Sequence, residues 1–473
     1  MAILAIDQGT TSTRGLLVED SGETRIVESI AHKQYYPEPG WVEHDPEELI
    51  QHIQMCIDKC DNLAAIGIDN QGESCLAWNA ETKKAITPVI VWQDNRTRLA
   101  VETLKSGGAQ DLVLKKAGLP LVPYFSATKF AWIMKNIPAA HKLLDHGKLR
   151  MGTTDAFFLD RLTGRCVTDI TTASRTSLMN LKTGQWDKDL CDLFGVPIEA
   201  LPEIVSTTGD FGRIMSKDRA VPILASIVDQ QAALYGHGCK NPGNVKITFG
   251  TGAFALMVTG DTPCQSSDQG LLPTVAWQLE GEKPVYALDG GVYSAGSAIN
   301  WARSLGLFET YDQICQFEKP FAIKRDLAFV PALSGLGCPY WDRTAGGIWI
   351  GLSLDTRPTD LMQSIIEGIV FRAAEVIAAM NELIPITEAI SIDGGLSANP
   401  YFCQFLADVL NRQVRVQSSA ELTAFGTAKL ISGQGKDLEM SHHLSRSYHP
   451  ETDMGQYLEK FKDAVNRSLQ WRP

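Results

Sequence analysis

The sequence lacks the long apolar runs and the basic excess that would indicate a membrane or nucleic-acid partner. No stretch approaches the roughly 20 apolar residues of a membrane-spanning helix, and the opening "MAILAIDQG" has no basic region before Asp7. We therefore expect no signal peptide, no membrane partner and a cytoplasmic location. The formal net charge of -12 argues against nucleic acid, because its binders usually present a basic face.

The sequence also lacks the motifs of two large nucleotide-binding classes. It contains no G-x-x-x-x-G-K-[ST] motif and no G-x-G-x-x-G between a strand and a helix, which disfavours P-loop enzymes and Rossmann dehydrogenases. Its ten cysteines show no zinc or redox spacing. Cys56 and Cys60 lie four residues apart on an expected helix, where two core thiols are the simpler interpretation.

What the sequence does contain is two similar halves. Its 473 residues exceed one ordinary core and predict two large domains. Apolar strands alternate with amphipathic helices in the first half, which is typical of an α/β domain. A stretch rich in turn residues at 236–244 marks the boundary.

Each half opens on the same local plan. Residues 4–20, "LAIDQGTTSTRGLLVED", and residues 245–260, "VKITFGTGAFALMVTG", both run from an apolar strand through a Gly-Thr turn into another strand. A repeated hairpin at the start of each half indicates duplicated domains that face each other. A third glycine-rich tip, "DGG" at 393–395, joins a strand to a helix.

The polar residues at the two Gly-Thr turns are suited to hold phosphate beside backbone amides. The hydroxyl donors are Thr10, Thr11, Ser12 and Thr251. Arg14 adds a charge-assisted donor. Taken singly, the threonines fit ordinary hairpins equally well. Because the pattern is doubled and Asp7 precedes the first turn, we predict that these turns hold nucleotide phosphates, with Asp7 facing their Mg²⁺.

Long blocks of the sequence resemble the FGGY family of carbohydrate kinases, and most closely its members that phosphorylate glycerol. The matching blocks include "AIDQGTTSTR", "GWVEHDPEE", "VIVWQDNRT", "TASRTSLMN", "DQQAALYGHG", "GLGCPYWD" and "DGGLSANPYFCQFLADVL". The resemblance implies an α/β, actin-like ATPase fold with two ribonuclease-H-like domains and a cleft between them. It implies an N-terminal kinase domain at 1–237 with the polyol site, a C-terminal domain at 244–434 with the ATP site, and a tail with a closing helix at 435–473.

Carried over position by position, the resemblance assigns residues to both substrates. The phosphate positions are Thr10, Thr11, Ser12, Arg14 and Thr251. Further nucleotide positions are Gly296, Asn300, Gly395 and Asn399. The family usually has Gln where Asn300 stands, which keeps an amide in place. The polyol positions are Glu73, Trp92, Tyr124, Asp229 and Gln230.

Asp229 is the candidate catalytic residue. It follows the apolar strand "VPILASIV" and precedes "QQAALYG", a placement that is commonest for a helix N-cap. Transfer of a γ-phosphoryl group to an alcohol, however, needs an acceptor for the hydroxyl proton. The following glutamines and the family match favour Asp229 as this general base.

The expected function is ATP-dependent phosphorylation of a small polyol, with glycerol to glycerol 3-phosphate as the leading candidate. Gly72 in "IDNQGES" raises an alternative, because relatives that use glycerol read N-Q-R-E-T there. Loss of that arginine predicts glycerol binding weaker by roughly tenfold or more, unless a cation such as Arg96 reaches in. It would also leave room for a longer polyol or sugar. A nucleotide switch of the actin type is a remote alternative, because it would not need the polyol residues.

The resemblance also suggests assembly into a homo-oligomer, a dimer or a tetramer. Family members that fructose 1,6-bisphosphate controls carry a glycine- and arginine-rich loop shortly before the catalytic Asp. The corresponding stretch here, "GRIMSKDRAVPILASIVD", has no glycine run. We therefore expect no such control.

Overall fold

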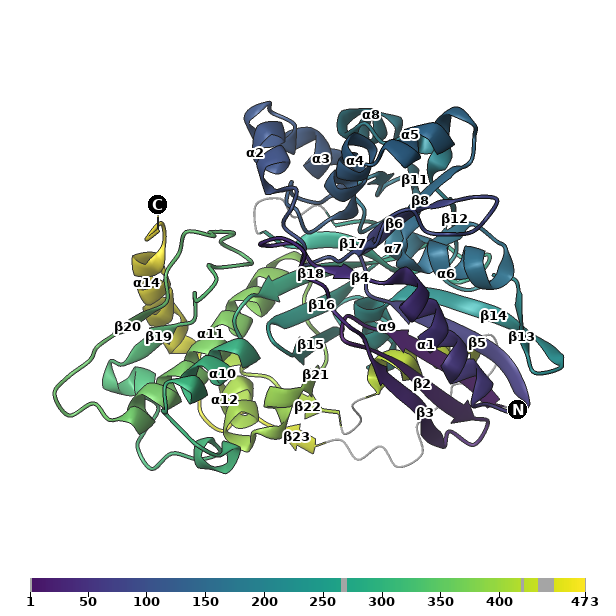
Figure 1. Ribbon diagram of the computed structural model, residues 1–473. Helices are drawn as coiled ribbons and strands as arrows, with labels where there is room; N and C mark the ends of the chain where they lie inside the picture. Colours follow the sequence, from purple (N-terminus) through teal and green to yellow (C-terminus); the bar gives the residue numbers. More distant parts are fainter. Residues whose placement is uncertain (1, 265–269, 418–420, 433–445, 473) are drawn as a thin grey trace.

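The computed structural model describes residues 2–264, 270–417, 421–432 and 446–472. They form two bodies, each built around one mixed β-sheet (Figure 1). Of the predicted tail, 435–473, the first part and the last residue lie outside the described residues. None of the helices in these ranges combines the length and the apolar character needed to cross a membrane.

The helices are taken in chain order. They are α1 (Pro46–Asp58), α2 (Arg98–Ser106), α3 (Gln110–Ala117), α4 (Ser126–Asn136), α5 (Pro138–Asp145), α6 (Thr154–Thr163), α7 (Ile170–Ala173), α8 (Lys188–Phe194), α9 (Asp229–Gly236), α10 (Gly296–Ser304), α11 (Pro358–Leu383), α12 (Pro400–Leu410), α13 (Leu422–Ser432) and α14 (Leu458–Ser468). The N-cap of α1 is Asp45, whose side chain accepts a hydrogen bond from the Glu47 amide at 2.9 Å.

The first sheet combines strands from the whole first half of the chain. Their order is β13 (Arg213–Ser216), β14 (Arg219–Val228), β5 (Leu63–Asn70), β1 (Ala2–Gln8), β2 (Ser12–Glu19) and β3 (Thr24–Ala31). β1, β2 and β3 are antiparallel, whereas β5 and β14 run parallel to β1. The strands predicted around the first Gly-Thr turn are therefore β1 and β2.

The second sheet repeats this arrangement. Its order is β17 (Leu272–Trp277), β18 (Val285–Val292), β16 (Ala253–Gly260), β15 (Val245–Phe249), β21 (Ile390–Gly394), β22 (Val414–Val416) and β23 (Arg446–Tyr448). β15, β16 and β18 are antiparallel, and β21 and β22 run parallel to β15. The five strands from β18 to β22 thus follow the plan of β3, β2, β1, β5 and β14. This repetition confirms the duplication that the two hairpins predict.

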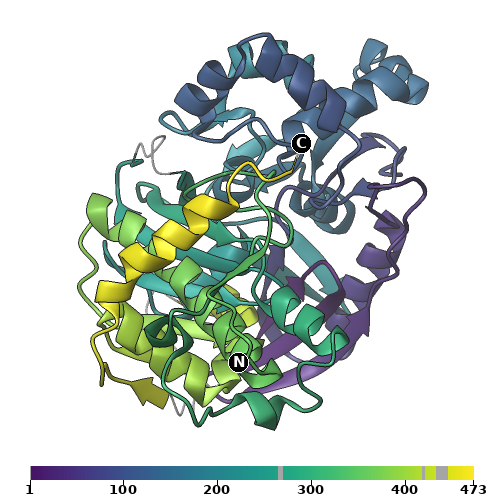
Figure 2. The ribbon, with the colours of Figure 1, turned by 90° about the vertical axis from the view of Figure 1, so that its left-hand side faces the viewer.

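Smaller strands complete the two bodies. A four-stranded sheet has the order β4 (Glu43–His44), β7 (Val89–Ile90), β6 (Cys75–Asn79) and β8 (Leu149–Thr153). The remaining pairs are β9 (Val167–Asp169) with β12 (Glu203–Val205), β10 (Met179–Asn180) with β11 (Gln185–Trp186), and β19 (Ala328–Val330) with β20 (Ile348–Ile350). Helices α2, α3, α4, α5 and α8 gather at the top of the first body in Figure 1. On the second body, α14 packs on α11 and β19 and lies along the outer surface (Figure 2).

Helices cover both faces of the first sheet because successive side chains of a strand point to opposite sides. Leu4 and Ile6 of β1 pack with residues of α1 and α6. Ala5 points to the other face and packs with α13. Strand β1 is therefore buried on both sides, and its polar end at Asp7 is held in a fixed position.

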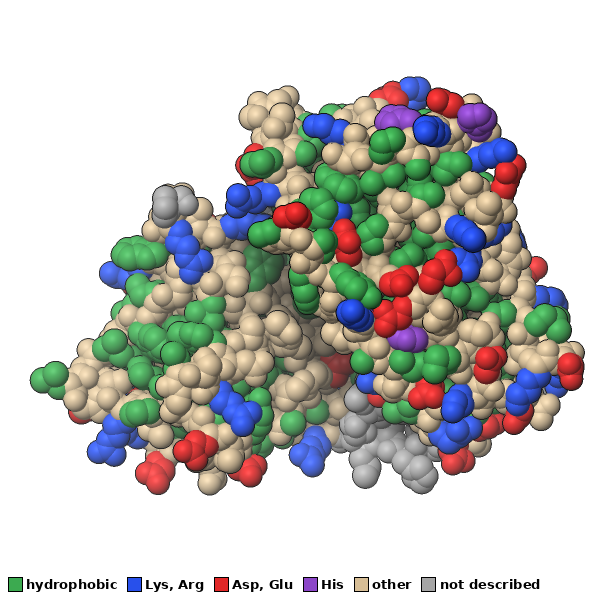
Figure 3. Space-filling model, viewed as in Figure 1, with side chains coloured by type: hydrophobic (Ala, Val, Ile, Leu, Met, Phe, Trp, Pro, Cys, Tyr) green, Lys and Arg blue, Asp and Glu red, His purple; other side chains and the backbone are tan. Residues whose placement is uncertain are grey.

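Two helices, α9 and α13, lie between the two sheets. Ala424 of α13 packs with Ala5 of the first sheet. On the other side, Leu430 of α13 and Leu234 of α9 pack with Leu256 of β16. Although α13 falls in the range expected for the second domain, it completes the core of the first. The surface is hollowed where the two bodies meet (Figure 3).

The crossing of α9 and α13 leaves no room for a side chain at Gly426. A Cβ there would lie 1.9 Å from the carbonyl oxygen of Ala232. Alanine ordinarily stabilises a helix by about 1 kcal/mol relative to glycine, but Gly426→Ala should instead destabilise the protein by about 1–3 kcal/mol. Thermal unfolding measures this, with Gly107→Ala as control, because the nearest atom there is 3.4 Å away. Equal Tm values for the two variants would contradict the close crossing.

Candidate active site

The predicted polyol residues meet at one cavity of about 200 Å³ in the hollow between the two bodies. The five are Glu73, Trp92, Tyr124, Asp229 and Gln230, and all of them line it. They come from the ends of β5 and β14 and from the segments after β7 and before α4. The Trp92 and Tyr124 rings lie 5.3 Å apart at 60° and supply an apolar wall.

The register of the first sheet explains why distant residues converge. Asp7 of β1 lies beside Asp69 of β5, and Asp69 lies beside Ile227 of β14. The three strands are parallel, so their carboxyl ends reach the same edge of the sheet. Gln71 and Asp229 follow directly at that edge. The candidate base, the acceptor residues and the predicted metal ligand are neighbours for this reason.

Asp229 is the first residue of α9, and the N-cap position is Val228. Its Oδ1 accepts a hydrogen bond from the Gln230 amide at 2.6 Å. Burial, together with the negative charges of Asp7 and Glu73, raises the pKa of Asp229 to about 7. A carboxylate with a pKa near neutrality is suited to take a proton from an alcohol and release it again.

The raised pKa of Asp229 predicts a pH dependence. Below about pH 7 the carboxyl group is protonated and cannot accept the hydroxyl proton, so kcat/KM should fall about tenfold per pH unit. Above about pH 7 the Asp229 carboxyl group is ionised, and kcat/KM should stop rising with pH. Initial rates between pH 5.5 and 8.5 measure the profile, which would be flat if another group were the base.

The cavity is also lined by residues that the sequence did not predict as site residues, among them Arg175, Phe254 and Asp289. Arg175 follows α7 and is 5% exposed. Its Nε donates to Glu73 Oε1 at 2.6 Å, and its Nη2 lies 3.1 Å from Asp289 Oδ2. The guanidinium therefore joins a carboxylate of the first domain to one on β18 of the second.

Glu73 has a backbone conformation that L-residues seldom adopt, with φ +62°. Such a conformation costs about 1–3 kcal/mol and persists where its surroundings hold it. The Glu73 carbonyl oxygen accepts a hydrogen bond from the Ser126 hydroxyl at 2.9 Å, and the side chain is held by Arg175. Burial raises the pKa of Glu73 although the Arg175 charge lowers it.

Asp7 does not stand alone at the end of β1. Its carboxyl group is hydrogen-bonded to that of Asp69, which is fully buried and accepts a second hydrogen bond from Thr427 Oγ1 of α13 at 2.8 Å. Burial raises the pKa of Asp7, and burial with the Asp7 charge raises that of Asp69 well above its usual range. The Asp69 carboxyl group therefore holds a proton more tightly than that of Asp7.

The first phosphate turn borders the acceptor cavity. Thr10 lines that cavity, and its hydroxyl accepts a hydrogen bond from Trp92 Nε1 at 2.9 Å. Thr11 is exposed, and Ser12 is half-buried at the start of β2. Arg14 is paired with Glu421, whose carboxylate oxygens lie 2.8 and 3.0 Å from its Nη1.

The second phosphate turn lies beside two further nucleotide positions. The Gly250 carbonyl oxygen accepts a hydrogen bond from the Gly296 amide at 2.9 Å, which joins the turn holding Thr251 to the start of α10. Gly394 pairs with Phe249 in the sheet, so Gly395 lies at the same edge. Open space surrounds the position of a Gly395 Cβ.

The two predicted amides on this side differ in their surroundings. Asn300 is exposed on α10, and its Oδ1 accepts a hydrogen bond from the Tyr311 hydroxyl at 3.4 Å. Asn399 is 8% exposed and caps α12, because its Oδ1 accepts from the Phe402 amide at 3.0 Å. Its Nδ2 donates to the Ile314 carbonyl at 2.8 Å. Both hydrogen bonds tie the Asn399 side chain to the backbone around it.

Lys246 of β15 connects the two sides of the cleft. It is fully buried, and its Nζ donates to Gln230 Oε1 at 2.7 Å and to Thr248 Oγ1 at 2.9 Å. Burial lowers the pKa of Lys246. Gln230 of the acceptor cavity is therefore fixed by a residue of the second sheet.

Val228 borders the space that Gly72 is expected to open for a longer acceptor. A Cβ on Gly72 would lie 3.1 Å from Val228 Cγ1, so the acceptor length stays a prediction. The expectation that Arg96 could reach the site is wrong. Arg96 Nη2 pairs with Glu43 at 2.7 Å and Asp94 at 2.8 Å, so this cation is held outside the cavity.

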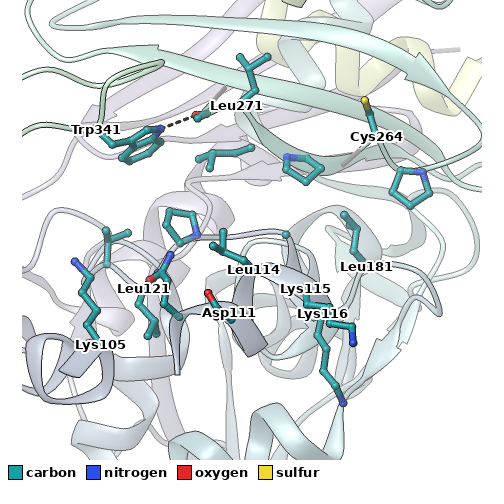
Figure 4. Close-up of a pocket in the computed structure, with 18 of the residues that line it drawn as sticks. Lys105, Asp111, Leu114, Lys115, Lys116, Leu121, Leu181, Cys264, Leu271 and Trp341 are labelled. Atoms are coloured by element: carbon teal, nitrogen blue, oxygen red, sulfur yellow. Dashed lines mark hydrogen bonds between the residues drawn. The ribbon is translucent and has the colours of Figure 1, made fainter. Parts of the chain in front are cut away.

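A larger cavity, of about 910 Å³, lies between α3 and the start of β17 (Figure 4). Leu114 of α3 faces it from one side, and Leu271 and Trp341 face it from the other. Trp341 Nε1 donates to the Gly270 carbonyl oxygen at 2.6 Å. Within the described ranges, the predicted site residues do not line it, and we assign it no part in the reaction.

Comparison with protein families gives two matches that together span most of the chain. Residues 2–236 match the N-terminal domain of the FGGY family of carbohydrate kinases, and residues 245–432 match its C-terminal domain. A glycerol kinase from Pseudothermotoga lettingae is 38% identical over 99% of this chain and 98% of its own length. One from Nitrosomonas eutropha is 41% identical over 92% of this chain and 90% of its own.

Comparison with solved structures agrees. The crystal structure of Plasmodium falciparum glycerol kinase with ADP has a TM-score of 0.91 and 30% identity, covering 99% of this chain and 98% of that one. A ligand-bound xylulose kinase from Lactobacillus acidophilus has a TM-score of 0.86 at 24% identity, covering 98% and 97%. The expected actin-like fold is confirmed.

Proposed function

The chain belongs to the FGGY family of carbohydrate kinases, and we propose that it transfers the γ-phosphoryl group of ATP to a terminal hydroxyl of glycerol, giving glycerol 3-phosphate. The observation that carries this proposal is the single small cavity lined by all five polyol residues and bordered by Thr10 of the first phosphate turn. Relatives at 38% and 41% identity that bear the name glycerol kinase support the choice of acceptor.

In the proposed reaction Asp229 accepts the proton of the attacking hydroxyl. The hydroxyl oxygen forms a bond to the γ-phosphorus while the bond to the β–γ bridging oxygen breaks, and ADP leaves. Asp229 is suited to this role because it lines the cavity and its pKa of about 7 lets it act near neutral pH. Most of the rate enhancement of such a transfer comes from positioning and charge stabilisation.

Side chains on opposite walls of the cavity would orient the polyol. Glu73 and Asp229 offer carboxylate oxygens to hydroxyl hydrogens, whereas Trp92 and Tyr124 cover the carbon chain. Gln230 is positioned by Lys246. A terminal hydroxyl beside Asp229 is then close to the turn at Thr10, where we propose that the γ-phosphate lies.

The remaining assigned residues would bind the nucleotide. Thr10, Thr11, Ser12 and Arg14 face its phosphates from the first domain in this proposal. Thr251, Gly296, Asn300, Gly395 and Asn399 contribute from the second. Since Arg14 is paired with Glu421 at 2.8 Å in this structure, an incoming phosphate has to compete with Glu421 for the guanidinium.

The residues at the end of β1 fit Mg²⁺. Among the described residues, no group of three or more His, Cys, Asp or Glu side chains could hold a metal ion. Mg²⁺ commonly takes one or two carboxylates and completes its octahedron with phosphate oxygens and water, so the Asp7 carboxylate would suffice as its protein ligand. Bound there with ATP, Mg²⁺ would neutralise the charge of the transferring phosphates. We include homo-oligomerisation and a cytoplasmic location, where ATP is available, in the same proposal.

A panel of acceptors tests the proposed function. ADP formation is measured with glycerol, erythritol, xylitol, dihydroxyacetone and xylulose, and without acceptor. We expect the highest kcat/KM for glycerol, because Val228 limits the cavity beside Gly72. A longer polyol or a ketose with the highest value would replace glycerol as the acceptor. ADP formation that no acceptor increases would favour a nucleotide switch.

A further inference from the structure

We propose that Arg175 donates a hydrogen bond from Nη1 to an oxygen of the acceptor, and that Val228 closes position 72 to any side chain that could do so. The inference rests on the proposed function, since it concerns the acceptor site of that reaction. It assigns to this chain a donor that the sequence comparison places elsewhere, at the position of Gly72.

The first observation is an unsatisfied buried charge. Arg175 uses Nε and Nη2 for Glu73 and Asp289, but its Nη1 has no hydrogen-bond partner among the residues that the structure describes. Leaving a buried donor unpaired costs about 1–3 kcal/mol, and more for a charged group. Because Arg175 lines the acceptor cavity, a bound acceptor can supply the missing partner.

The second observation is that the other donors of the cavity are neutral. The Tyr124 hydroxyl and the Gln230 side-chain amide line it, but neither carries a charge. Trp92 Nε1 is already used by Thr10. The side-chain amide of Gln71 contacts His44 at 3.3 Å and Gln8 at 3.5 Å, and that of Gln231 donates to Thr274 and Val275.

Acceptor groups, by contrast, are abundant, since Glu73, Asp229 and Asp289 all line the cavity. Each hydroxyl oxygen of a polyol both donates and accepts. Three carboxylates satisfy its hydrogens, but its lone pairs need a donor. The Arg175 guanidinium is the charged donor present.

The third observation concerns position 72. Gly72 is buried, and its neighbour Val228 is 3% exposed and fixed by a hydrogen bond from its amide to Thr171 Oγ1 at 3.0 Å. A side chain at 72 would begin 3.1 Å from Val228 Cγ1 and has to displace it. Arg96 is bound by two carboxylates and stacks on the Trp41 ring at 3.8 Å. The cation of the acceptor site therefore comes from residue 175.

Ligands with one oxygen removed test this assignment without relying on stability. Propane-1,3-diol lacks the middle oxygen of glycerol, and propane-1,2-diol lacks one end oxygen. In the native enzyme, removing the oxygen that Arg175 contacts should lower kcat/KM by about 10- to 150-fold, the equivalent of a hydrogen bond to a charged group.

The same measurements are made on Arg175→Lys, which keeps the positive charge between Glu73 and Asp289 but loses Nη1. With glycerol its kcat/KM should fall by about the same 10- to 150-fold, mainly through KM. In this variant, removal of the contacted oxygen should lower kcat/KM by less than about threefold, because its hydrogen-bond partner, Nη1, is already gone. The assignment is overturned if Arg175→Lys discriminates against both diols as strongly as the native enzyme does, because the loss from the substitution and the loss from oxygen removal would then be independent.

Arg96→Lys is the matched control. Arg96 is also a buried arginine between two carboxylates, with 1% of its side chain exposed, but it does not line the acceptor cavity. Its variant should discriminate against the diols as the native enzyme does. An effect of Arg96→Lys equal to that of Arg175→Lys would overturn the proposal, because loss of any buried ion pair would then explain the result.

A measurement on the native enzyme covers the case in which Arg175→Lys does not fold. Dihydroxyacetone and 3-fluoropropane-1,2-diol each carry one position that accepts but cannot donate a hydrogen bond. At the position that Arg175 contacts, kcat/KM for the analogue that accepts a hydrogen bond should exceed kcat/KM for the diol that lacks the oxygen by about tenfold or more. If analogue and diol had equal kcat/KM at both positions, the assignment would be overturned.

Position 72 is tested with two further variants. Gly72→Arg should lower kcat/KM for glycerol by about 100-fold or more, because Val228 is displaced next to Asp229. Gly72→Arg combined with Val228→Gly should recover most of that loss. No recovery would overturn the role of Val228. Turnover of glycerol by the native enzyme tests the proposed function independently of these variants. If the enzyme uses another acceptor, the deoxy analogues of that acceptor replace the two diols.

Discussion

Asp229→Asn should lower kcat by about 10²–10⁴-fold, the usual contribution of a general base. The amide keeps the size of the side chain but cannot accept the hydroxyl proton. The hydrogen bond from the Gln230 amide to Oδ1 can still form with the amide oxygen, so the start of α9 should keep its geometry. ATP binding, which depends on the turns at Thr10 and Thr251, should persist.

Two measurements separate loss of chemistry from loss of binding. Calorimetric titration with a non-hydrolysable ATP analogue should give similar Kd values for the native enzyme and Asp229→Asn. The acidic limb of the pH profile should disappear from the residual activity. Asp155→Asn is a matched control, since Asp155 is a buried aspartate of the same domain whose pKa burial raises to about 6, outside the acceptor cavity. Near-native turnover by Asp229→Asn at neutral pH would remove Asp229 as the base.

Asp7→Asn should raise the Mg²⁺ concentration for half-maximal activity by at least about 10- to 100-fold, whereas Asp69→Asn should change it by less than about threefold. The difference follows from the pKa values of the pair. Asp69 holds a proton more tightly than Asp7, because its pKa is raised well above the usual range, and asparagine resembles a protonated aspartate in shape and donor capacity. Asp7 offers the carboxylate that a cation would meet.

Activity measured against Mg²⁺ concentration at saturating ATP makes this comparison directly. Both variants remove one carboxyl group from the same buried pair, so each controls for the packing of the other. A larger effect in Asp69→Asn would reverse the two roles. Equal, small effects would show that neither carboxyl group contributes to metal binding.

Several structural elements could be predicted from the sequence because they depend on residues that are close together in the chain. The helix start at Asp45, the two Gly-Thr hairpins and the Asp-Gly-Gly tip each depend on neighbouring residues. The apolar stretch at 85–94, by contrast, predicts a longer strand than the structure has, since β7 covers only Val89–Ile90. Pro88 offers no amide hydrogen just before it, and the chain turns at Trp92 and Gln93.

The parts of the site that sequence did not predict depend on contacts between distant segments. Arg175 and Asp289 follow ordinary-looking stretches, and only the folded chain brings them to Glu73. Val228 is one more apolar residue at the end of a strand until Gly72 lies against it. A signal existed for Arg175, because a charged residue within "TTASRTSLMN" has to be paired if it is buried.

The position of α13 has a consequence for how the chain acquires its structure during synthesis. The first sheet is complete in sequence by residue 228, but one of its faces stays uncovered until residues 422–432 leave the ribosome. A nascent chain of half the final length therefore exposes Ala5, Leu16 and Val18 to solvent. We therefore expect the first domain to complete its core only when nearly the last helix has been made, and a fragment that ends at the domain boundary to be less stable than the full chain. Mutations near residue 426 would thus affect the amount of protein a cell accumulates even where the purified enzyme retains its activity.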